Sequence, residues 1–322
     1  MRRISRLPVE AWVALLCAVL FAALGAAVPG FASPGNLRNL FSSLLPLVAV
    51  AVGETLVLVT GGIDLSVTAV IALASVLGAR VMTEDGGLLA GHPFAVPAAA
   101  AAMLATGLAV GAVNGLAVAR LRMPPFLATL AVTTFASGFA IWLTQSEGIA
   151  GLPAGFRALG AGRVGLFPAA LVVVAPLALA AHALLARTVA GRWLFAIGGN
   201  ARAARVSGVP VERALLLAYV ACGACAAVAS VLYTARLETG SPVLGQRLFL
   251  DVIGAVVIGG TSLFGGRGSV AGTILGALFI TLLDNGLNLM GLSSFAVLMV
   301  KGAVILAAAL VDALRERLLG SR

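Results

Sequence analysis

Long apolar segments fill most of this chain of 322 residues, and short polar or glycine-rich stretches separate them. About 20 consecutive apolar residues are enough to cross the hydrocarbon core of a bilayer as a helix. By that criterion the pattern predicts ten transmembrane helices, over residues 11–30, 44–61, 63–82, 94–119, 125–146, 166–186, 214–236, 248–264, 269–289 and 293–312. The stretches between them are too short for a soluble domain. We therefore expect one all-α, polytopic membrane domain.

Two junctions between predicted helices are glycine-rich breaks. Residues 60–66 (Thr-Gly-Gly-Ile-Asp-Leu-Ser) separate the second and third helices, and residues 259–268 (Gly-Gly-Thr-Ser-Leu-Phe-Gly-Gly-Arg-Gly) separate the eighth and ninth. Non-helical backbone at membrane depth persists only where protein or a water-filled cavity satisfies its polar groups. We therefore interpret five residues as structural breaks: Gly61, Gly62, Asp64, Gly259 and Gly260.

Asp64 follows the first glycine pair and precedes the third predicted helix. There a carboxylate can accept hydrogen bonds from free N–H groups and complement the positive end of the helix. An intramembrane carboxylate is also a candidate proton relay or ion ligand. Other acidic residues within or near the spans are Glu54, Asp251 and Asp284, and Lys301, the only lysine of the chain, is a possible partner for them. The sequence does not show which of these pairs form.

The longest polar interruption covers residues 187–213 and is strongly basic. Within it Asn200 is placed as an N-cap, residues 201–207 as a short helix and Gly208 as its left-handed stop, with Pro210 just beyond. The pattern therefore predicts a helix of about two turns with both of its ends specified.

A helix of two turns is too short to be stable alone in water, so this one must dock on something. Arg202 and Arg205 lie three residues apart and share one side of it. A shallow face that a groove on a partner protein could accept is formed by small residues, namely Ala203, Ala204 and Ser207. The alternative is a helix that rests on its own membrane domain, or on anionic lipid through its arginines.

The composition supports a membrane location, because 61% of the residues are hydrophobic, 10% are charged and the mean hydropathy is +1.11. The formal net charge of +9 would suggest nucleic acid in a soluble domain, but here the arginine bias of cytoplasmic loops explains it. With both termini in the cytoplasm, most arginines lie inside, and those left outside are Arg38, Arg80, Arg157, Arg163, Arg236 and Arg247. This orientation places residues 187–213 in the cytoplasm.

A short internal repeat relates the two halves of the chain. Asn114-Gly-Leu lies near the end of the fourth predicted helix, and Asn285-Gly-Leu lies near the end of the ninth. Helices five spans apart have opposite orientations, which is the arrangement of inverted-topology transporters. Four in-span amide or hydroxyl side chains are candidates either for hydrogen bonding between helices or for lining a polar solute path: Asn114, Thr129, Asn285 and Asn288.

The sequence offers little support for chemistry carried out by this chain itself. Lys301 follows Val300 with no glycine-rich loop before it, so the phosphate-binding loop of P-loop ATPases is absent. His92 and His182 lack the spacing of metal ligands. An intramembrane enzyme would require Ser137 and His182, which fall on different spans, to meet without a nucleophile motif. We expect no catalytic residue, no cofactor, no metal and no nucleic-acid partner.

At several of these motifs the chain resembles the permease subunits of bacterial carbohydrate-uptake ABC importers, the ribose, galactose, xylose and arabinose permease family. The resemblance covers residues 31–312. The motifs that carry it are residues 60–67 (Thr-Gly-Gly-Ile-Asp-Leu-Ser-Val), 196–200 (Ala-Ile-Gly-Gly-Asn), 203–208 (Ala-Ala-Arg-Val-Ser-Gly), 257–268 (Val-Ile-Gly-Gly-Thr-Ser-Leu-Phe-Gly-Gly-Arg-Gly) and 285–289 (Asn-Gly-Leu-Asn-Leu).

The resemblance implies a permease of the bacterial inner membrane that pairs with a second permease subunit, receives a monosaccharide-like solute from a periplasmic or lipid-anchored binding protein, and works by alternating access. A separate cytoplasmic ATPase would drive it. The coupling element that contacts this ATPase would then comprise Gly199, Asn200, Ala203, Ala204, Arg205 and Gly208.

The chain departs from the family pattern at three places. Thr68 stands where Gly is usual, Leu248-Phe-Leu-Asp251 replaces a frequent Tyr-Glu-Leu-Asp, and Asp284 replaces a common Asn. These departures bear on the identity of the solute more than on the mechanism. The alternative function is a secondary transporter of a small polar solute, coupled to an ion through Asp64 or Asp284.

Overall fold

A computed structural model describes residues 8–164 and 167–320 of the chain, almost entirely as helices. In the first half lie α1 (Val9–Ala27), α2 (Pro34–Leu58), α3 (Val67–Met82), α4 (Ala95–Ala119), α5 (Pro125–Thr144) and α6 (Ala154–Ala161). The strands β1 (Arg163–Val164) and β2 (Phe167–Pro168) pair antiparallel. In the second half lie α7 (Ala170–Arg187), α8 (Val189–Val206), α9 (Val211–Leu237), α10 (Leu248–Ile258), α11 (Val270–Leu289) and α12 (Ser294–Gly320).

Each of the ten predicted spans coincides with one helix, which confirms an all-α polytopic membrane protein. Among the described residues, eight helices are long and apolar enough to cross a membrane, and α3 and α10 are shorter apolar helices. These two short helices correspond to the third and eighth predicted spans, so they are five spans apart, as the inverted repeat requires.

Two differences from the prediction concern length and loops. The eighth predicted span, residues 248–264, is helical only over the 11 residues of α10, which rise about 16 Å against an apolar layer of about 30 Å. Non-helical backbone therefore lies at membrane depth on either side of it. The loop predicted before residue 166 contains α6 and β1, and residues 189–199, predicted as polar loop, are helical as the first part of α8.

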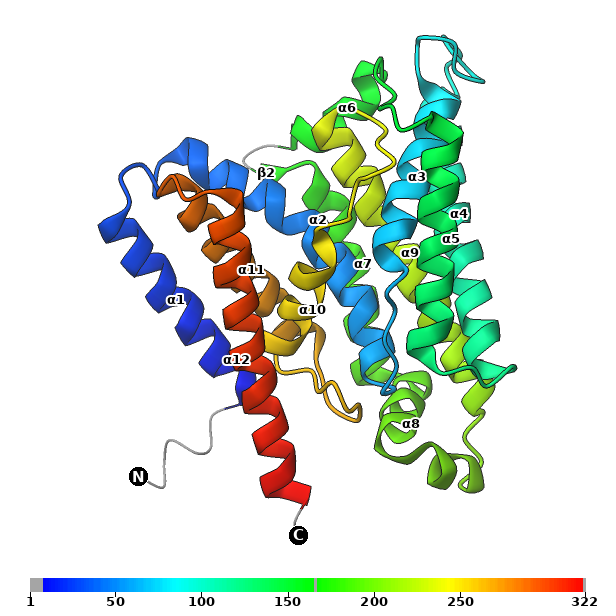
Figure 1. Cartoon of the computed structure of the whole chain (residues 1–322), viewed down its shortest axis with the longest axis vertical. Helices are drawn as coiled ribbons and strands as arrows, with labels where there is room; N and C mark the ends of the chain where they lie inside the picture. The colour runs from blue at the N-terminus through cyan, green and yellow to red at the C-terminus, as the bar shows by residue number, and fades with distance from the viewer. Residues whose placement is uncertain (1–7, 165–166, 321–322) are drawn as a thin grey trace.

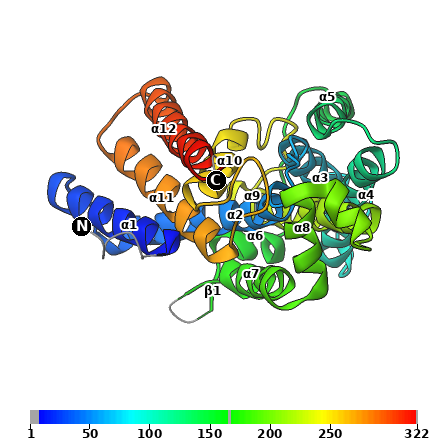
Figure 2. The ribbon, with the colours of Figure 1, turned by 90° about the horizontal axis from the view of Figure 1, so that it is seen from below.

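The helices stand side by side, and the two ends of the bundle differ (Figure 1). Helix α8 lies at the end where α1 begins and α12 ends, which we call the α8 end; α6 and the strands lie at the opposite end, the α6 end. Figure 2 shows α2 between one group formed by α1, α11 and α12 and another formed by α3, α4 and α5. In α2, 83% of the most apolar stretch is buried, against 11% in α1 and in α12, so α2 is the central helix.

Helices α4 and α9 approach each other through glycines. A Cβ atom on Gly107 would overlap the carbonyl oxygen of Gly223, and a Cβ on Gly223 would overlap the carbonyl oxygen of Gly107. A Cβ on Gly111 would likewise overlap the carbonyl oxygen of Tyr219. Small residues allow this approach of backbones, which lipid-like side chains cannot drive in a bilayer.

This contact generates a first prediction. Gly107→Val should force α4 and α9 apart at a cost of about 1–3 kcal/mol, the usual cost of overpacking, and should reduce the yield of monodisperse protein in detergent at least severalfold. The matched control is Gly25→Val in α1, because nothing lies within 4 Å of a Cβ at that position. Size-exclusion chromatography of both variants measures the effect, and equal yields would contradict the close contact.

Candidate functional site: a glycine junction and an intramembrane ion cluster

The two predicted breaks meet at the α8 end of the bundle. The N–H of Gly266 donates a hydrogen bond to the carbonyl oxygen of Val59, at 2.9 Å. A Cβ atom on Gly265 would come within 2.7 Å of the amide nitrogen of Gly61. Gly61 and Gly265 have φ of +80° and +86°, a conformation that side chains with a Cβ rarely adopt. The break between α2 and α3 and the break between α10 and α11 therefore satisfy part of each other's backbone.

Helix α8 joins the same contact through Gly198. A Cβ on Gly198 would overlap both the carbonyl oxygen of Val59 and the amide nitrogen of Gly266. Only a glycine therefore lets α8 lie this close to the two breaks. We call this contact between Gly61, Gly198, Gly265 and Gly266 the glycine junction.

Helix α8 is kinked directly after the glycine junction, at Asn200. Asn200 leaves the helical region with φ −165° and ψ 103°, and its Oδ1 accepts hydrogen bonds from the N–H groups of Arg202 and Ala203, both at 3.0 Å. At the other end Gly208 has φ of +82°, and the N–H of Val209 donates to the carbonyl oxygen of Ala204 at 3.0 Å. The predicted N-cap and the predicted left-handed stop are both confirmed.

The surface that this terminal turn exposes differs from the predicted small-residue face. Ala204 is only 5% exposed and packs in the main hydrophobic core of the chain, so it cannot enter a partner's groove. The helix end rests on its own membrane domain through this residue, which is one of the alternatives that the sequence left open. Arg205 is partly engaged, since its guanidinium lies 2.8 Å from the carboxylate of Glu212.

Other residues of the same turn are open to a partner. Val206 is 90% exposed, so its apolar side chain is available for contact. It lies one turn beyond Arg202, which is exposed as well. We define the docking face as Arg202, Ala203, Val206 and Ser207, all of them exposed. Sequence reasoning missed Val206, although an apolar residue between Arg205 and Ser207 in a polar segment was a signal for it.

Three of the four candidate path residues make contacts that hold helices and loops together. Asn114, fully buried on α4, donates from Nδ2 to the hydroxyl of Ser66 at 2.7 Å. Thr129 on α5 donates to the carbonyl oxygen of Pro125 at 2.9 Å and lies 3.4 Å from that of Ile63. Asn285 on α11 exchanges two hydrogen bonds with Asn36 on α2, at 2.8 and 2.9 Å.

Asp64 lies inside the first break and is 1% exposed. Its Oδ1 accepts from the N–H and the hydroxyl of Ser66, at 2.9 and 2.6 Å, and its own N–H donates to Glu54 Oε1 at 3.0 Å. The expected capping of α3 by Asp64 is wrong: Asp64 lies two residues before Ser66, the residue that precedes α3, and no described side chain makes a cap hydrogen bond at the start of that helix. Asp64 organises the break from within the protein.

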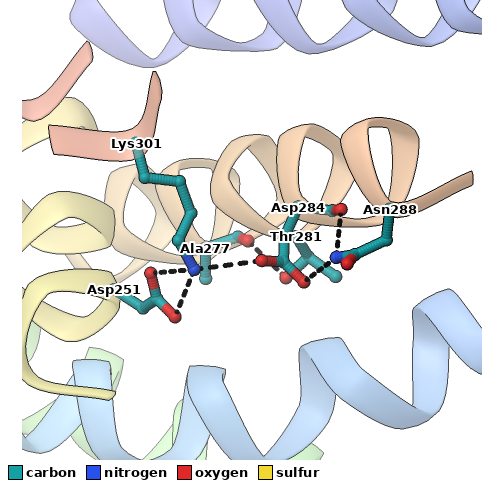
Figure 3. Close-up of polar contacts among 6 residues, drawn as sticks. All are labelled: Asp251, Ala277, Thr281, Asp284, Asn288 and Lys301. Carbon is teal, nitrogen blue, oxygen red and sulfur yellow. Dashed lines mark hydrogen bonds and ion pairs between the residues drawn. The ribbon is translucent and has the colours of Figure 1, made fainter. Parts of the chain in front are cut away.

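Two acidic residues of the second half, Asp251 and Asp284, form an ion cluster with Lys301 on three helices (Figure 3). Lys301 on α12 places its Nζ 2.8 Å from Asp251 Oδ1 on α10 and 3.0 Å from Asp284 Oδ1 on α11. Asn288, one turn after Asp284, donates to the carboxylate of Asp284 at 3.2 Å. The sequence left the partner of Lys301 open; the structure pairs it with both carboxylates.

Beside this cluster the protein is hollowed into a pocket of about 220 Å³, which we call the Lys301 pocket. It lies toward the α6 end, because the last turns of α11 and the first two turns of α12 form it. Its lining is Arg247, Asp284, Asn288, Ser294, Phe295, Val297, Leu298 and Lys301. Of the four candidate path residues, Asn288 is therefore placed at a cavity.

These features define a polytopic α-helical membrane protein: apolar helices packed as a bundle, backbone breaks that the protein itself satisfies at membrane depth, and an ion cluster shared by three helices. The model of the family described as the permease component of the branched-chain amino acid transport system matches residues 36–309, so the chain belongs to this permease family.

Curated relatives match over nearly their whole length. The chain is 38% identical to the ribose import permease protein of Escherichia coli strain K12 over 304 residues, covering 93% of this chain and 92% of the relative. It is 41% identical to the ribose import permease protein of Bacillus subtilis strain 168 over 288 residues, 88% and 86% of the two chains. The D-allose transport system permease protein of E. coli K12 is 32% identical over 301 residues, 93% and 90%. No solved structure gives a significant match.

The glycine junction yields a second prediction, with two neighbouring residues as a matched pair. Gly198→Ala should push α8 away from Val59 and Gly266 and lower the melting temperature of the detergent-purified protein by several degrees, since overpacking costs about 1–3 kcal/mol. Gly199→Ala should leave the melting temperature unchanged, because a Cβ there meets nothing within 4 Å. Thermal unfolding followed by intrinsic fluorescence compares the two, and an unchanged Gly198→Ala protein would refute the junction.

Proposed function

We propose that this chain is the transmembrane subunit of an ATP-driven importer that carries a monosaccharide-like solute into the cytoplasm by alternating access. A separate ATPase supplies the energy, a second permease subunit completes the path, and a periplasmic or lipid-anchored binding protein delivers the solute. The single observation that carries this proposal is the exposed docking face of α8, joined through Gly198 to both backbone breaks.

The choice of solute rests on the family and on the relatives. The chain shares the permease family over most of its length, and relatives of 32–41% identity are named for ribose or D-allose. Both are neutral monosaccharides. Since this chain covers nine-tenths or more of two of those relatives, a solute of the same class is the one to test.

The glycine junction supports a route from the ATPase to the path. A partner that binds the docking face acts on the last turn of α8, which Asn200 separates from the rest of that helix. Movement of α8 bears directly on Val59 and Gly266, because no side chain stands between their backbones and Gly198. The segments displaced would be the ends of α2 and α10 and the starts of α3 and α11. Packed interfaces of this kind transmit small shifts as steps between discrete arrangements.

The orientation follows from the arginines. The docking face must meet a cytoplasmic ATPase, and the positive-inside rule places the arginine-rich α8 end, with both termini, in the cytoplasm of a bacterial inner membrane. The α6 end then faces outward, toward the binding protein. Among the described residues of the α8 end, Arg120, Arg122, Arg187, Arg192, Arg202 and Arg213 contribute to that bias.

A reconstitution experiment tests the proposed function. The chain is reconstituted with a candidate ATPase subunit and a candidate sugar-binding protein, and uptake of radiolabelled D-ribose and D-allose is measured in proteoliposomes. We expect uptake of at least one of the two sugars that requires ATP and all three components and is unaffected by ionophores. Uptake by the permease alone that follows a proton or sodium gradient would instead establish the ion-coupled alternative.

A third prediction concerns the docking face. Val206→Asp should reduce the amount of ATPase that co-purifies with the permease at least about fivefold, because burying an unpaired carboxylate in a contact surface is costly. The yield of permease itself should not change, since Val206 is 90% exposed. The matched control is Leu88→Asp, 81% exposed in the loop before α4. Normal co-purification of the Val206→Asp protein would reject the docking face as the ATPase contact.

A further inference from the structure

The Lys301 pocket exposes charged and polar groups within the apolar layer. The side chain of Asp284 is 44% exposed, and Asn288 and Arg247 are exposed as well. Asp284 lies about 8 Å from the end of α11 and Lys301 about 10 Å from the start of α12, at 1.5 Å per residue. Charged groups facing lipid at such depth are costly, by about 2.5–3.5 kcal/mol each at the centre. This face of the bundle therefore looks onto water or a partner subunit.

An ion cluster with a purely structural role would be buried by protein on all sides. This one is buried on the side of Asp251 and accessible on the side of Asp284. Asp251, behind Lys301, keeps 13% of its side chain exposed, in contrast with Asp284 on the pocket side. The side chain of Arg247 makes no hydrogen bond or ion pair with any residue in the described ranges 8–164 and 167–320. Hydrogen-bonding capacity is thus left open toward the pocket.

The charges around the pocket balance. Arg247, Lys301 and Asp284 line it, and Asp251 pairs with Lys301 from behind, so the two cations and the two carboxylates sum to zero. A cationic or an anionic solute would meet two attractive and two repulsive charges, and would gain little. A neutral solute with hydroxyl groups can instead donate to Asp284 and accept from Arg247 at once.

The remaining lining fits a small ring with an apolar face. Phe295 at the pocket rim is 78% exposed, and an aromatic side chain offers a flat apolar surface beside polar partners. A volume of about 220 Å³ is below the usual range of about 300–1,000 Å³ for sites of drug-sized ligands. The pocket therefore suits one small ring better than two.

We infer that the Lys301 pocket binds a neutral, polyhydroxylated single-ring solute on the α6 side of the transmembrane path, with Asp284, Asn288 and Arg247 as its polar contacts. The inference deepens the proposed function, because it assigns the first contact of the imported solute within the membrane domain to named residues. In it Lys301 is a positioning residue, which holds Asp284 against α10 and α12.

Accessibility to charged reagents tests the pocket without the partner proteins. The native cysteines Cys17, Cys222 and Cys225 are buried, so an introduced thiol can be labelled over a low background. In membranes that contain the full chain, methanethiosulfonates with a trimethylammonium or a sulfonate group should both modify Asn288→Cys at least about tenfold faster than Met299→Cys. Met299 is the matched control, because it is 75% exposed on α12 and does not line the pocket.

The two reagents also measure the charge balance. In the Asn288→Cys background, Arg247→Gln should favour the cationic reagent and Asp284→Asn the anionic one, each by about fivefold in the rate ratio. Without these changes the ratio should match that of a free thiol in solution. Labelling of Asn288→Cys no faster than that of Met299→Cys, or entry of one reagent only, would overturn the inference.

Uptake separates failure of the inference from failure of the proposed function. In the complete importer, Asn288→Ala should reduce uptake of D-ribose, or of D-allose where the wild type prefers it, at least about fivefold, while ATPase co-purification stays normal. The sugar, delivered with the binding protein, should also slow labelling of Asn288→Cys. Wild-type uptake in the Asn288→Ala protein, with no protection by the sugar, would reject the pocket as a solute site. A wild-type importer that takes up neither sugar with ATP would reject the proposed function itself.

Discussion

Backbone polar groups inside an apolar layer must be satisfied by the protein, and the rest of this structure depends on how two helix breaks meet that constraint. The break after α2 and the break after α10 close on each other through the hydrogen bond from Gly266 to Val59, and Asp64 with Ser66 closes the first break from inside. Without the other break beside it, each break would leave backbone polar groups unsatisfied in the lipid. Because α8 packs against both breaks through Gly198, this polar surface helix and the two buried breaks are in direct backbone contact.

The same constraint explains which polar side chains make hydrogen bonds within the protein and which remain accessible. Asn114 hydrogen-bonds the first break and fixes α4 to it. Asn285 exchanges hydrogen bonds with Asn36 and so joins α11 to α2. These contacts hold helices together in a medium where apolar side chains give no preference for protein over lipid. Asn288, only one turn beyond Asn285, lies at a pocket instead. Position relative to the neighbouring helix decides between the two roles, and the type of residue does not.

This dependence on neighbours sets the limit of what the sequence could predict. The number of long apolar segments and the two ends of the last turn of α8 are local properties, so apolar length and the residues Asn200 and Gly208 were enough to predict them. The direction in which a side chain of α8 faces depends on tertiary packing, and for that reason Ala204 was wrongly expected to be open while Val206 was overlooked. The pairing of Lys301 with two carboxylates, 50 and 17 residues away in the chain, is likewise set by contacts between helices. The shortness of α10 was missed because the predicted span of residues 248–264 was extended to Leu263 and Phe264, although the glycine-rich break begins at Gly259, directly after the helix ends.

The resemblance leads one to expect an asparagine at position 284, and the structure shows what a carboxylate there changes. With an asparagine at that position, Asp251 alone would face the two cations Lys301 and Arg247, and the pocket would carry one net positive charge. Asp284 removes that excess and at the same time ties α11 to α12 through Lys301. A carboxylate with nearly half of its surface open at membrane depth is costly where it faces lipid, so its exposure accords with a pocket that holds water or a polar solute. The position that departs from the resemblance is thus the one that makes the pocket neutral.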